Sequence, residues 1–424
     1  MAVEMYRHSR RRAAAGLVLV AVLGVAACSP DTTLPTAHRM DIGKPPTGPF
    51  ASTGPTASTA STASTDGARL FPGFEVTSAV RIDSAPAAAG ATFIGSAFPR
   101  DGRSSLSFYG FNAEGTLWRV DTNPSCVGTV LTSVGGQPAV VILDSDARQD
   151  GQGPVSFTTA TAFSAGSGDV LWGPTEVPGP SAGNGLIFAN TPKALTAGTT
   201  PGTLLDAGTG SVVETPAGET ALYEHHGAAL IGTESKFLAV DTGSRGTLWS
   251  ADELRRPNGT TAGAKVRFTG SYGPATGGVV VLRWEEQGMK PQDVVYDLRT
   301  GEPLGQLAGS PAGMAVTDGS SGTVLLASEL TDGSQLITAV RPGAGTLWTK
   351  SFARSARITA AGPGGAYAEL DGVAAKIDID SGAILDTGDY VLPVSLLPDG
   401  TALFPTKERT VYALAVPEKQ GAPG

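Results

Sequence analysis

The tetrapeptide Gly-Thr-Leu-Trp occurs three times in this chain, at Gly115–Trp118, Gly246–Trp249 and Gly345–Trp348. A looser copy, "GDVLW", ends at Trp172, so four of the five tryptophans share one local setting. In each copy an apolar run leads into a glycine-containing polar turn, and a second short apolar run ends in the tryptophan. Such self-similarity indicates a repeat architecture in which each copy marks one supersecondary unit.

Three further copies lack the tryptophan: "GTLLDAGTGSVVE" at 202–214, "VVYDLRTGEPLGQL" at 294–307 and "AAKIDIDSGAILD" at 374–386. Between the copies lie apolar runs of five to eight residues that end at Asp-Gly or Pro-Gly turns, most regularly in 322–352. This pattern is typical of antiparallel strands joined by tight turns, and no helical periodicity of useful length follows residue 30. Four strands per repeat of about forty-five residues predict an all-β fold, a β-propeller of four-stranded antiparallel blades.

The two ends of the repeat region predict how the propeller closes. Three strand-like runs follow the seventh copy, in 390–416, whereas one isolated strand-like run precedes the first copy, at 68–76. Pairing the N- and C-terminal strands would complete an eighth blade and cover edges that would otherwise invite aggregation. We therefore predict eight blades, with seven as the alternative because 150–200 is weakly patterned.

The hairpin phrases resemble the repeat of pyrroloquinoline-quinone-type propellers, A-x-D-x-x-T-G-x-x-x-W. Glycine suits the turn of such a hairpin because the turn needs positive φ. In that family the tryptophan packs between neighbouring blades, where a large flat ring fits. The resemblance implies repeat Asp residues at Asp206, Asp241, Asp297 and Asp378, turn glycines at Gly210, Gly246, Gly301, Gly345 and Gly382, and blade-docking tryptophans at Trp118, Trp172, Trp249 and Trp348.

The N-terminus predicts export and lipidation. Arg10–Arg12 precede the apolar run 13–27, which is shorter than the roughly 20 residues that span a bilayer and fits a secretion signal. "VAAC", at Val25–Cys28, resembles the bacterial lipobox, which implies cleavage before Cys28 and a diacylglycerol on its thiol. An ordinary secretory signal with an incidental cysteine is the alternative.

Four segments follow from these patterns: a signal peptide at 1–27, a lipidated Cys28 with a disordered tether at 28–67, a β-propeller at 68–416 and a flexible tail at 417–424. The tether is rich in Ser, Thr, Ala and Pro and has too little apolar surface to offset the entropy of ordering. The expected location is the extracytoplasmic face of the cell membrane, with the folded part in water.

Composition excludes several classes of chemistry. The chain has two cysteines, Cys28 and Cys126, so lipidation of the first leaves no internal disulfide and no cysteine-based metal site. The formal net charge is −9, and removing 1–27, with four Arg and one Glu, brings it to −12, which disfavours nucleic-acid binding. The quinoprotein dehydrogenases that share the repeat hold their cofactor beneath a disulfide of adjacent cysteines, which this chain lacks.

Two clusters of acidic or histidine residues are candidate sites. Glu224, His225 and His226 are consecutive, but adjacent residues on a strand point to opposite faces, so we predict a structural pair, with a weak metal site as the alternative. Glu285 and Glu286 are predicted to form a solvated hairpin tip. We therefore expect no catalytic, cofactor or metal residues.

Together these patterns predict a monomeric, non-catalytic scaffold, tethered to the membrane by its lipid, that docks unidentified envelope or secreted proteins. Its signal and repeat resemble the BamB-like propeller lipoproteins of outer-membrane barrel assembly. The alternative is a propeller that binds a small ligand, or a quinone-dependent dehydrogenase-like enzyme. Loops longer than a blade requires, at 144–156, 173–185 and 251–265, are the candidate binding segments because binding concentrates on loops of rigid scaffolds.

Overall fold

The computed structural model separates the chain into two compact units, 1–32 and 33–424, and all described residues belong to the second unit. The described residues are 38–40, 69–98, 105–123, 128–150, 153–189, 202–270, 272–352 and 354–418, without the side chains of 38–40, 146–156 and 274. The predicted signal peptide, Cys28, most of the tether and Cys126 lie outside these ranges. No helix within them is long and apolar enough to cross a membrane.

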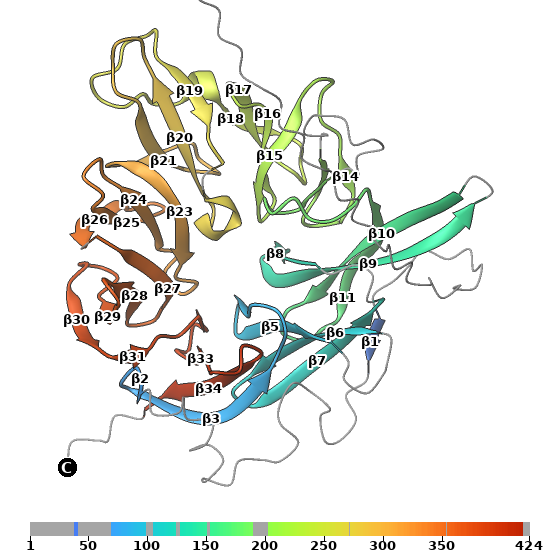
Figure 1. Cartoon of the computed structure of the whole chain (residues 1–424). Helices are drawn as coiled ribbons and strands as arrows, with labels where there is room; N and C mark the ends of the chain where they lie inside the picture. The colour runs from blue at the N-terminus through green and yellow to red at the C-terminus, as the bar shows by residue number, and fades with distance from the viewer. Residues whose placement is uncertain are drawn as a thin grey trace, which may run out of the picture. The chain divides into compact units, whose positions relative to one another are not determined.

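Eight antiparallel sheets are arranged around a common centre, with the first strand of each blade nearest the centre and the last at the periphery (Figure 1). The predicted all-β, eight-bladed propeller is confirmed. Blade 1 contains β4 (Ala87–Ala89), β5 (Thr92–Ala97), β6 (Leu106–Asn112) and β7 (Gly115–Thr122), and blade 2 contains β8 (Thr129–Val134), β9 (Gln137–Asp150), β10 (Gly153–Ser164) and β11 (Val170–Val177).

The third blade is the least regular one, as the weak pattern of 150–200 would suggest. It has three named strands, β12 (Ile187–Phe188), β13 (Thr203–Leu205) and β14 (Val212–Val213). A single bridge between Ser181 and Phe188 stands in the place of its first strand.

The next four blades are complete four-stranded sheets. Blade 4 contains β15 (Thr220–His225), β16 (Ala228–Thr233), β17 (Lys236–Asp241) and β18 (Thr247–Ser250), and blade 5 contains β19 (Lys265–Phe268), β20 (Val279–Glu285), β21 (Gln292–Asp297) and β22 (Pro303–Leu307). Blade 6 contains β23 (Ser310–Thr317), β24 (Val324–Glu329), β25 (Gln335–Arg341) and β26 (Gly345–Phe352), and blade 7 contains β27 (Ala356–Gly362), β28 (Gly365–Leu370), β29 (Val373–Ile377) and β30 (Ile384–Gly388). Two short 3-10 helices, η1 (Ala251–Glu253) and η2 (Gly273–Thr276), flank β19.

The two ends of the repeat region build the eighth blade together, as predicted. Its strands are β32 (Ser395–Leu396), β33 (Ala402–Pro405), β34 (Val411–Pro417) and, as the outermost strand, β3 (Phe74–Arg81) from the N-terminal side. The pairing of β3 with β34 runs from Phe74↔Pro417 to Arg81↔Val411. A second contact, the parallel pair of β2 (Arg69–Leu70) with β31 (Tyr390–Val391), precedes it.

The apolar core of the described residues is divided among the seams between blades. Eight buried clusters occur, and each one joins residues of two consecutive blades. Strand β20, whose sequence is continuously apolar, is an example. Val280 and Leu282 pack toward blade 4, whereas Val279 and Val281 pack toward blade 6. Because successive side chains of a strand point to opposite faces, a blade with neighbours on both sides needs apolar residues at every position.

Two segments differ from expectation. The predicted loop at 144–156 is mostly strand. β9 and β10 stay paired up to Asp150↔Gly153 and form a hairpin that extends away from the centre of the propeller (Figure 1). Main-chain pairing needs no apolar side chains, so a polar stretch could continue the ladder. Within the predicted tether, β1 (His38–Met40) pairs antiparallel with the outer strand of blade 1, β7.

Candidate functional site

The four tryptophans of the repeat are buried at seams between blades. Each indole N–H donates a hydrogen bond to a main-chain carbonyl oxygen of the following blade: Trp118 to Ala165 (2.7 Å), Trp172 to Ala207 (2.9 Å), Trp249 to Leu298 (2.9 Å) and Trp348 to Ile379 (2.9 Å). An indole that fills an apolar seam and also hydrogen-bonds across it fixes the position of the neighbouring blade.

The turn glycine of one blade lies against the tryptophan of the blade before it. Gly168, Gly210, Gly301 and Gly382 all have φ between 66° and 70°. A Cβ atom added at any of them would lie within 2.3–2.8 Å of the tryptophan side chain. Glycine is therefore required at these positions for two reasons: the backbone has a positive φ, and the tryptophan leaves no room for a Cβ atom. Gly168 was not predicted as a turn glycine because its phrase, "SAGSGDVLW", has no Asp at the repeat position.

The four repeat Asp residues hold the hairpin turns. In each case a carboxylate oxygen accepts a main-chain N–H three residues later: Asp206 from Thr209 (3.0 Å), Asp241 from Ser244 (2.9 Å), Asp297 from Thr300 (2.8 Å) and Asp378 from Ser381 (2.8 Å). Such bonds favour the ionised carboxylate, and hydrogen bonds from Ser244 and Ser381 lower the pKa of Asp241 and Asp378.

In blade 4 the turn is shifted by one residue relative to the prediction. Gly301 lies four positions after Asp297, and the residue four positions after Asp241 is Arg245. Arg245 takes the positive φ of 60° in place of Gly246. The preceding blade carries no tryptophan at this seam, where Val213 packs instead, so a side chain can occupy the turn. Gly345 has a φ of 81°, but the nearest atom to a Cβ there would be the Leu304 oxygen at 3.3 Å, not a ring.

The histidine pair lies on the same end of blade 4 as these hairpins. Strand β15 ends at His225, and His226 has a φ of 47°, so the two rings do not point to opposite faces but stack with centroids 3.9 Å apart and an interplanar angle of 16°. The expectation of opposite faces failed because it assumed that the strand continued. Burial, His226 and Arg299 lower the pKa of His225 to about 3, so this half-buried ring is neutral at physiological pH.

Arg299 of blade 5 connects the pair to the neighbouring hairpins. Its guanidinium donates to the main-chain oxygen of His226 (Nη2, 2.8 Å) and forms an ion pair with Asp241 (Nη1 to Oδ2, 3.4 Å). Within the described ranges, no group of three or more His, Cys, Asp or Glu side chains is arranged to hold a metal ion.

Glu224 is a buried carboxylate that pins the seam between blades 3 and 4. Its side chain accepts the main-chain N–H of Leu186 (2.7 Å) from blade 3 and that of Gly227 (2.8 Å) from its own turn. Burial raises its pKa to about 7, although the two N–H donors act in the opposite direction. This role could not be predicted from the sequence, because the burial of Glu224 depends on the turn of another blade.

Ionisation of Glu224 is expected to destabilise the fold as pH rises. The folded-state pKa of about 7 lies above the ordinary value of 4.5, so the folded chain binds this proton more tightly, and the stabilisation is lost as pH rises through about 7. We expect the free energy of unfolding of the wild type, relative to Glu224→Gln, to fall by about 2 kcal/mol between about pH 5 and pH 8. Urea titrations of both proteins measure this difference, and a difference that stays constant or grows with pH would contradict the assignment.

The connection between β19 and β20 places η2 near the centre of the ring (Figure 1) and ties three blades together. Thr276 exchanges a hydrogen bond with the Tyr223 hydroxyl of blade 4 (2.8 Å), and the Thr317 hydroxyl of blade 6 donates to Ala275 (2.8 Å). The Tyr272 hydroxyl donates to the Ala327 oxygen (2.5 Å), also in blade 6.

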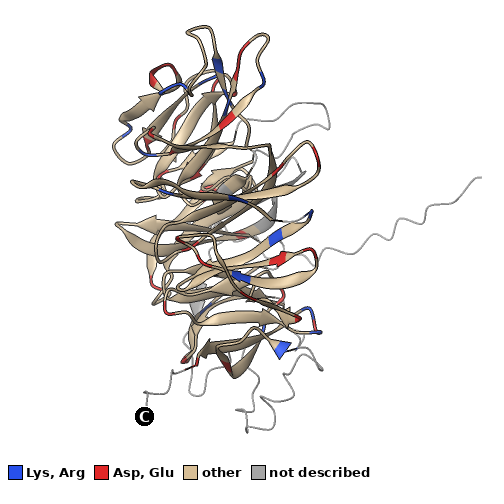
Figure 2. Cartoon of the chain, turned by 90° about the vertical axis from the view of Figure 1, so that its left-hand side faces the viewer, with Lys and Arg blue, Asp and Glu red and all other residues tan. Residues whose placement is uncertain are grey.

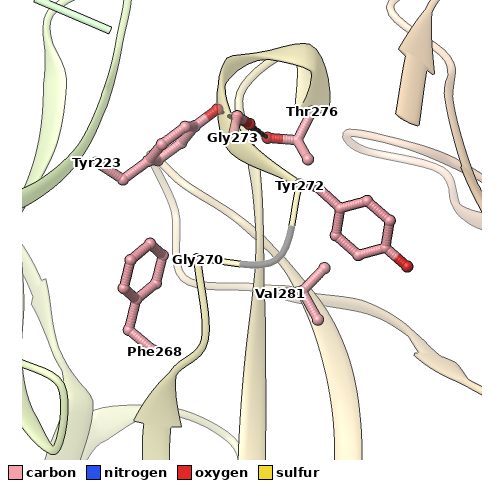
Figure 3. A pocket seen from close by; sticks show the side chains of 7 residues that line it. All are labelled: Tyr223, Phe268, Gly270, Tyr272, Gly273, Thr276 and Val281. Carbon is pink, nitrogen blue, oxygen red and sulfur yellow. Dashed lines mark hydrogen bonds between the residues drawn. The ribbon is translucent and has the colours of Figure 1, made fainter. Parts of the chain in front are cut away.

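A small cavity lies beneath this connection. Figure 3 shows its lining by Tyr223, Phe268 and Tyr272, with Thr276 and Val281. Its free volume is about 10 Å³, enough for one water molecule and far below the several hundred Å³ of a typical ligand pocket. This cavity as it stands fits no small organic ligand.

Of the predicted binding loops, 251–265 is held against blade 5. The Arg255 oxygen accepts the Tyr296 hydroxyl (2.8 Å), and the exposed carboxylate of Glu286 accepts the main-chain N–H (2.9 Å) and hydroxyl (2.6 Å) of Thr261. Glu285 pairs instead with Arg267 (3.6 Å).

The charged residues of the propeller lie mainly at turns and strand ends, as Figure 2 shows.

Comparison with known proteins adds little to the fold. No protein-family model matches the sequence, and a search of curated proteins found no match. Among solved structures, one described as the crystal structure of the eukaryotic initiation factor is similar over 82% of this chain and 93% of that chain, with 11% sequence identity and a TM-score of 0.34. A similarity at this level carries no information about function.

Proposed function

We propose that this chain is a lipid-anchored envelope protein whose propeller serves as a non-catalytic scaffold for other envelope or secreted proteins. The observation that carries the proposal is the closed ring: eight apolar seams, one between each pair of consecutive blades, with the last blade completed by the chain's own N-terminal side. Such a ring is rigid, and it leaves turns, loops and outer strands available for recognition.

The anchor is supported by the sequence "VAAC" at Val25–Cys28 and by the Ser/Thr/Ala/Pro-rich stretch that follows it. A lipid on Cys28 would keep the propeller at the membrane surface while the tether allows it to reach partners. A diacylglycerol supplies two acyl chains, which anchor a protein stably, whereas one chain alone binds membranes weakly.

Replacing Cys28 with serine is expected to abolish lipid labelling and to release the protein from the membrane fraction. The serine hydroxyl cannot take the thioether-linked lipid, so the readouts are metabolic labelling with an alkyne fatty acid and fractionation of cells. Cys126→Ser is the matched control and should keep both label and membrane association. Labelling that survives in Cys28→Ser would show that the anchor is elsewhere or does not exist.

The scaffold role is tested by crosslinking the lipid-anchored protein in intact cells and identifying what is captured. We expect defined envelope or secreted proteins, recovered at lower yield from the Cys28→Ser strain. The opposing result is a protein that captures no partner but is stabilised against heat by calcium or by a quinone, which would favour the small-ligand or enzymatic alternative.

A further inference from the structure

The outer edge of blade 1 is paired with a strand from outside the propeller repeats. β1 lies antiparallel to β7 in the register His38↔Asp121, Arg39↔Val120 and Met40↔Arg119. Twenty-eight residues of sequence, 41–68, separate β1 from the next described strand, β2. β1 is therefore not part of a hairpin with blade 1 and is added to a sheet that is already complete.

The pairing covers only part of the edge. β7 has eight residues, Gly115–Thr122, and β1 faces three of them. Among the described residues, Gly115–Trp118 has no strand on its outer side. Unpaired main-chain N–H and C=O groups on a long outer strand are a template for another extended segment.

Two other blades present less accessible outer edges, whereas β26 of blade 6 is also an eight-residue outer strand with no strand beside it among the described residues, so β7 is distinguished by the strand already bound to it. β18 has four residues and runs into η1, and β22 begins with Pro303, whose nitrogen cannot donate a hydrogen bond. In blade 8 the outer strand, β3, was itself recruited from the N-terminal side. The same chain thus adds strands from before the repeats to two neighbouring blades.

We propose that the outer edge of β7 is a strand-binding site that the chain's own segment His38–Met40 occupies in cis and that an extended segment of a partner protein takes in its place. This deepens the proposed scaffold function and depends on it. Three paired residues form few hydrogen bonds, and the free energy that these bonds contribute is comparable to the conformational entropy cost of ordering the three residues. The cis strand is therefore weakly held and can be exchanged. A longer strand would also use the partly exposed positions Gly115–Leu117 and would displace it, with affinity from main-chain hydrogen bonds.

Hydrogen–deuterium exchange of the β7 amides tests the cis strand. Arg39→Pro removes a main-chain donor from the centre of β1, and we expect the outward-facing amides of Arg119–Asp121 to exchange about tenfold faster or more than in the wild type. Ala57→Pro, in the same N-terminal segment but outside β1, is the control and should change nothing at β7. Identical exchange in Arg39→Pro and wild type would overturn the cis pairing.

A synthetic peptide of residues 36–42 then tests binding in trans. Added in excess to Arg39→Pro, it should restore slow exchange at Arg119–Asp121, whereas the same peptide with proline at position 39 should not. In the wild type the cis strand already protects these amides, so the same peptide should leave their exchange nearly unchanged. No protection of Arg39→Pro by the peptide would overturn the proposal.

Photo-crosslinking in intact cells separates failure of this site from failure of the scaffold role. One crosslinker replaces Glu114, in the exposed turn that leads into β7, and the matched control replaces Ser244 in the exposed turn of blade 4. We expect partner capture at Glu114 to exceed that at Ser244 and to rise in Arg39→Pro. Capture at Ser244 alone would overturn the edge site while leaving the scaffold role intact, and capture at neither position by membrane-bound protein would overturn both.

Discussion

Trp118→Ala is expected to lower the free energy of unfolding by about 4 kcal/mol, the usual range for deleting a fully buried large aromatic side chain being about 3–5 kcal/mol. The ring is completely buried at the seam between blades 1 and 2, between Gly110 of its own blade and Gly168 of the next. Its removal leaves a cavity and also leaves the Ala165 oxygen without its donor. Chemical denaturation of both proteins measures the loss.

Trp118→Phe is the matched control for this prediction. Phenylalanine keeps most of the apolar volume but has no N–H, so we expect a smaller loss of about 1–3 kcal/mol, the cost of an unsatisfied buried carbonyl. A loss below about 1 kcal/mol for Trp118→Ala would be incompatible with a blade-docking role for this ring.

Gly210→Ala is expected to lower the free energy of unfolding by about 2–5 kcal/mol, the sum of left-handed strain and overpacking. Its φ is 70°, and the added Cβ would lie 2.3 Å from the Trp172 ring. The measurement is again the denaturation midpoint of each purified protein.

Arg245→Gly is the counterpart of Gly210→Ala, because Arg245 occupies the equivalent turn position with a φ of 60° and faces a seam without tryptophan. Relief of left-handed strain is partly offset by the greater freedom of glycine in the unfolded chain, so we expect a gain between zero and about 1 kcal/mol. Equal losses at the two positions would mean that the tryptophan contact does not decide where glycine is needed.

The ring architecture could be predicted because its signals are local. The hairpin phrase contains its own turn and the tryptophan that docks the next blade. The incomplete blades at the two ends of the repeat region indicate how the propeller closes. The Trp172 phrase was recognisable even without an Asp, since the turn and the tryptophan kept their spacing.

Features that depend on neighbouring blades, or on the residue at which a strand ends, could not be predicted. Whether Arg245 or Gly246 takes the positive φ depends on the seam to the preceding blade, where Val213 and not a tryptophan is buried. The stacking of His225 on His226 depends on where β15 ends, and the burial of Glu224 depends on Leu186 of blade 3. The bond from Leu186 to Glu224 joins two blades, which no single-repeat pattern relates.

The most direct test of the closed ring is a disulfide between β3 and β34, in Glu75→Cys/Val416→Cys made in a Cys28→Ser/Cys126→Ser background. Glu75 and Val416 are directly paired, and directly opposed Cα atoms about 4.5–5.5 Å apart lie within disulfide range. The register control is Glu75→Cys/Ala413→Cys, in which the second cysteine lies three residues, about 10 Å, further along β34. A closed ring predicts near-complete oxidation of the first pair, seen as faster migration on non-reducing gels, and little oxidation of the second, whereas equal oxidation of both pairs or of neither would contradict it.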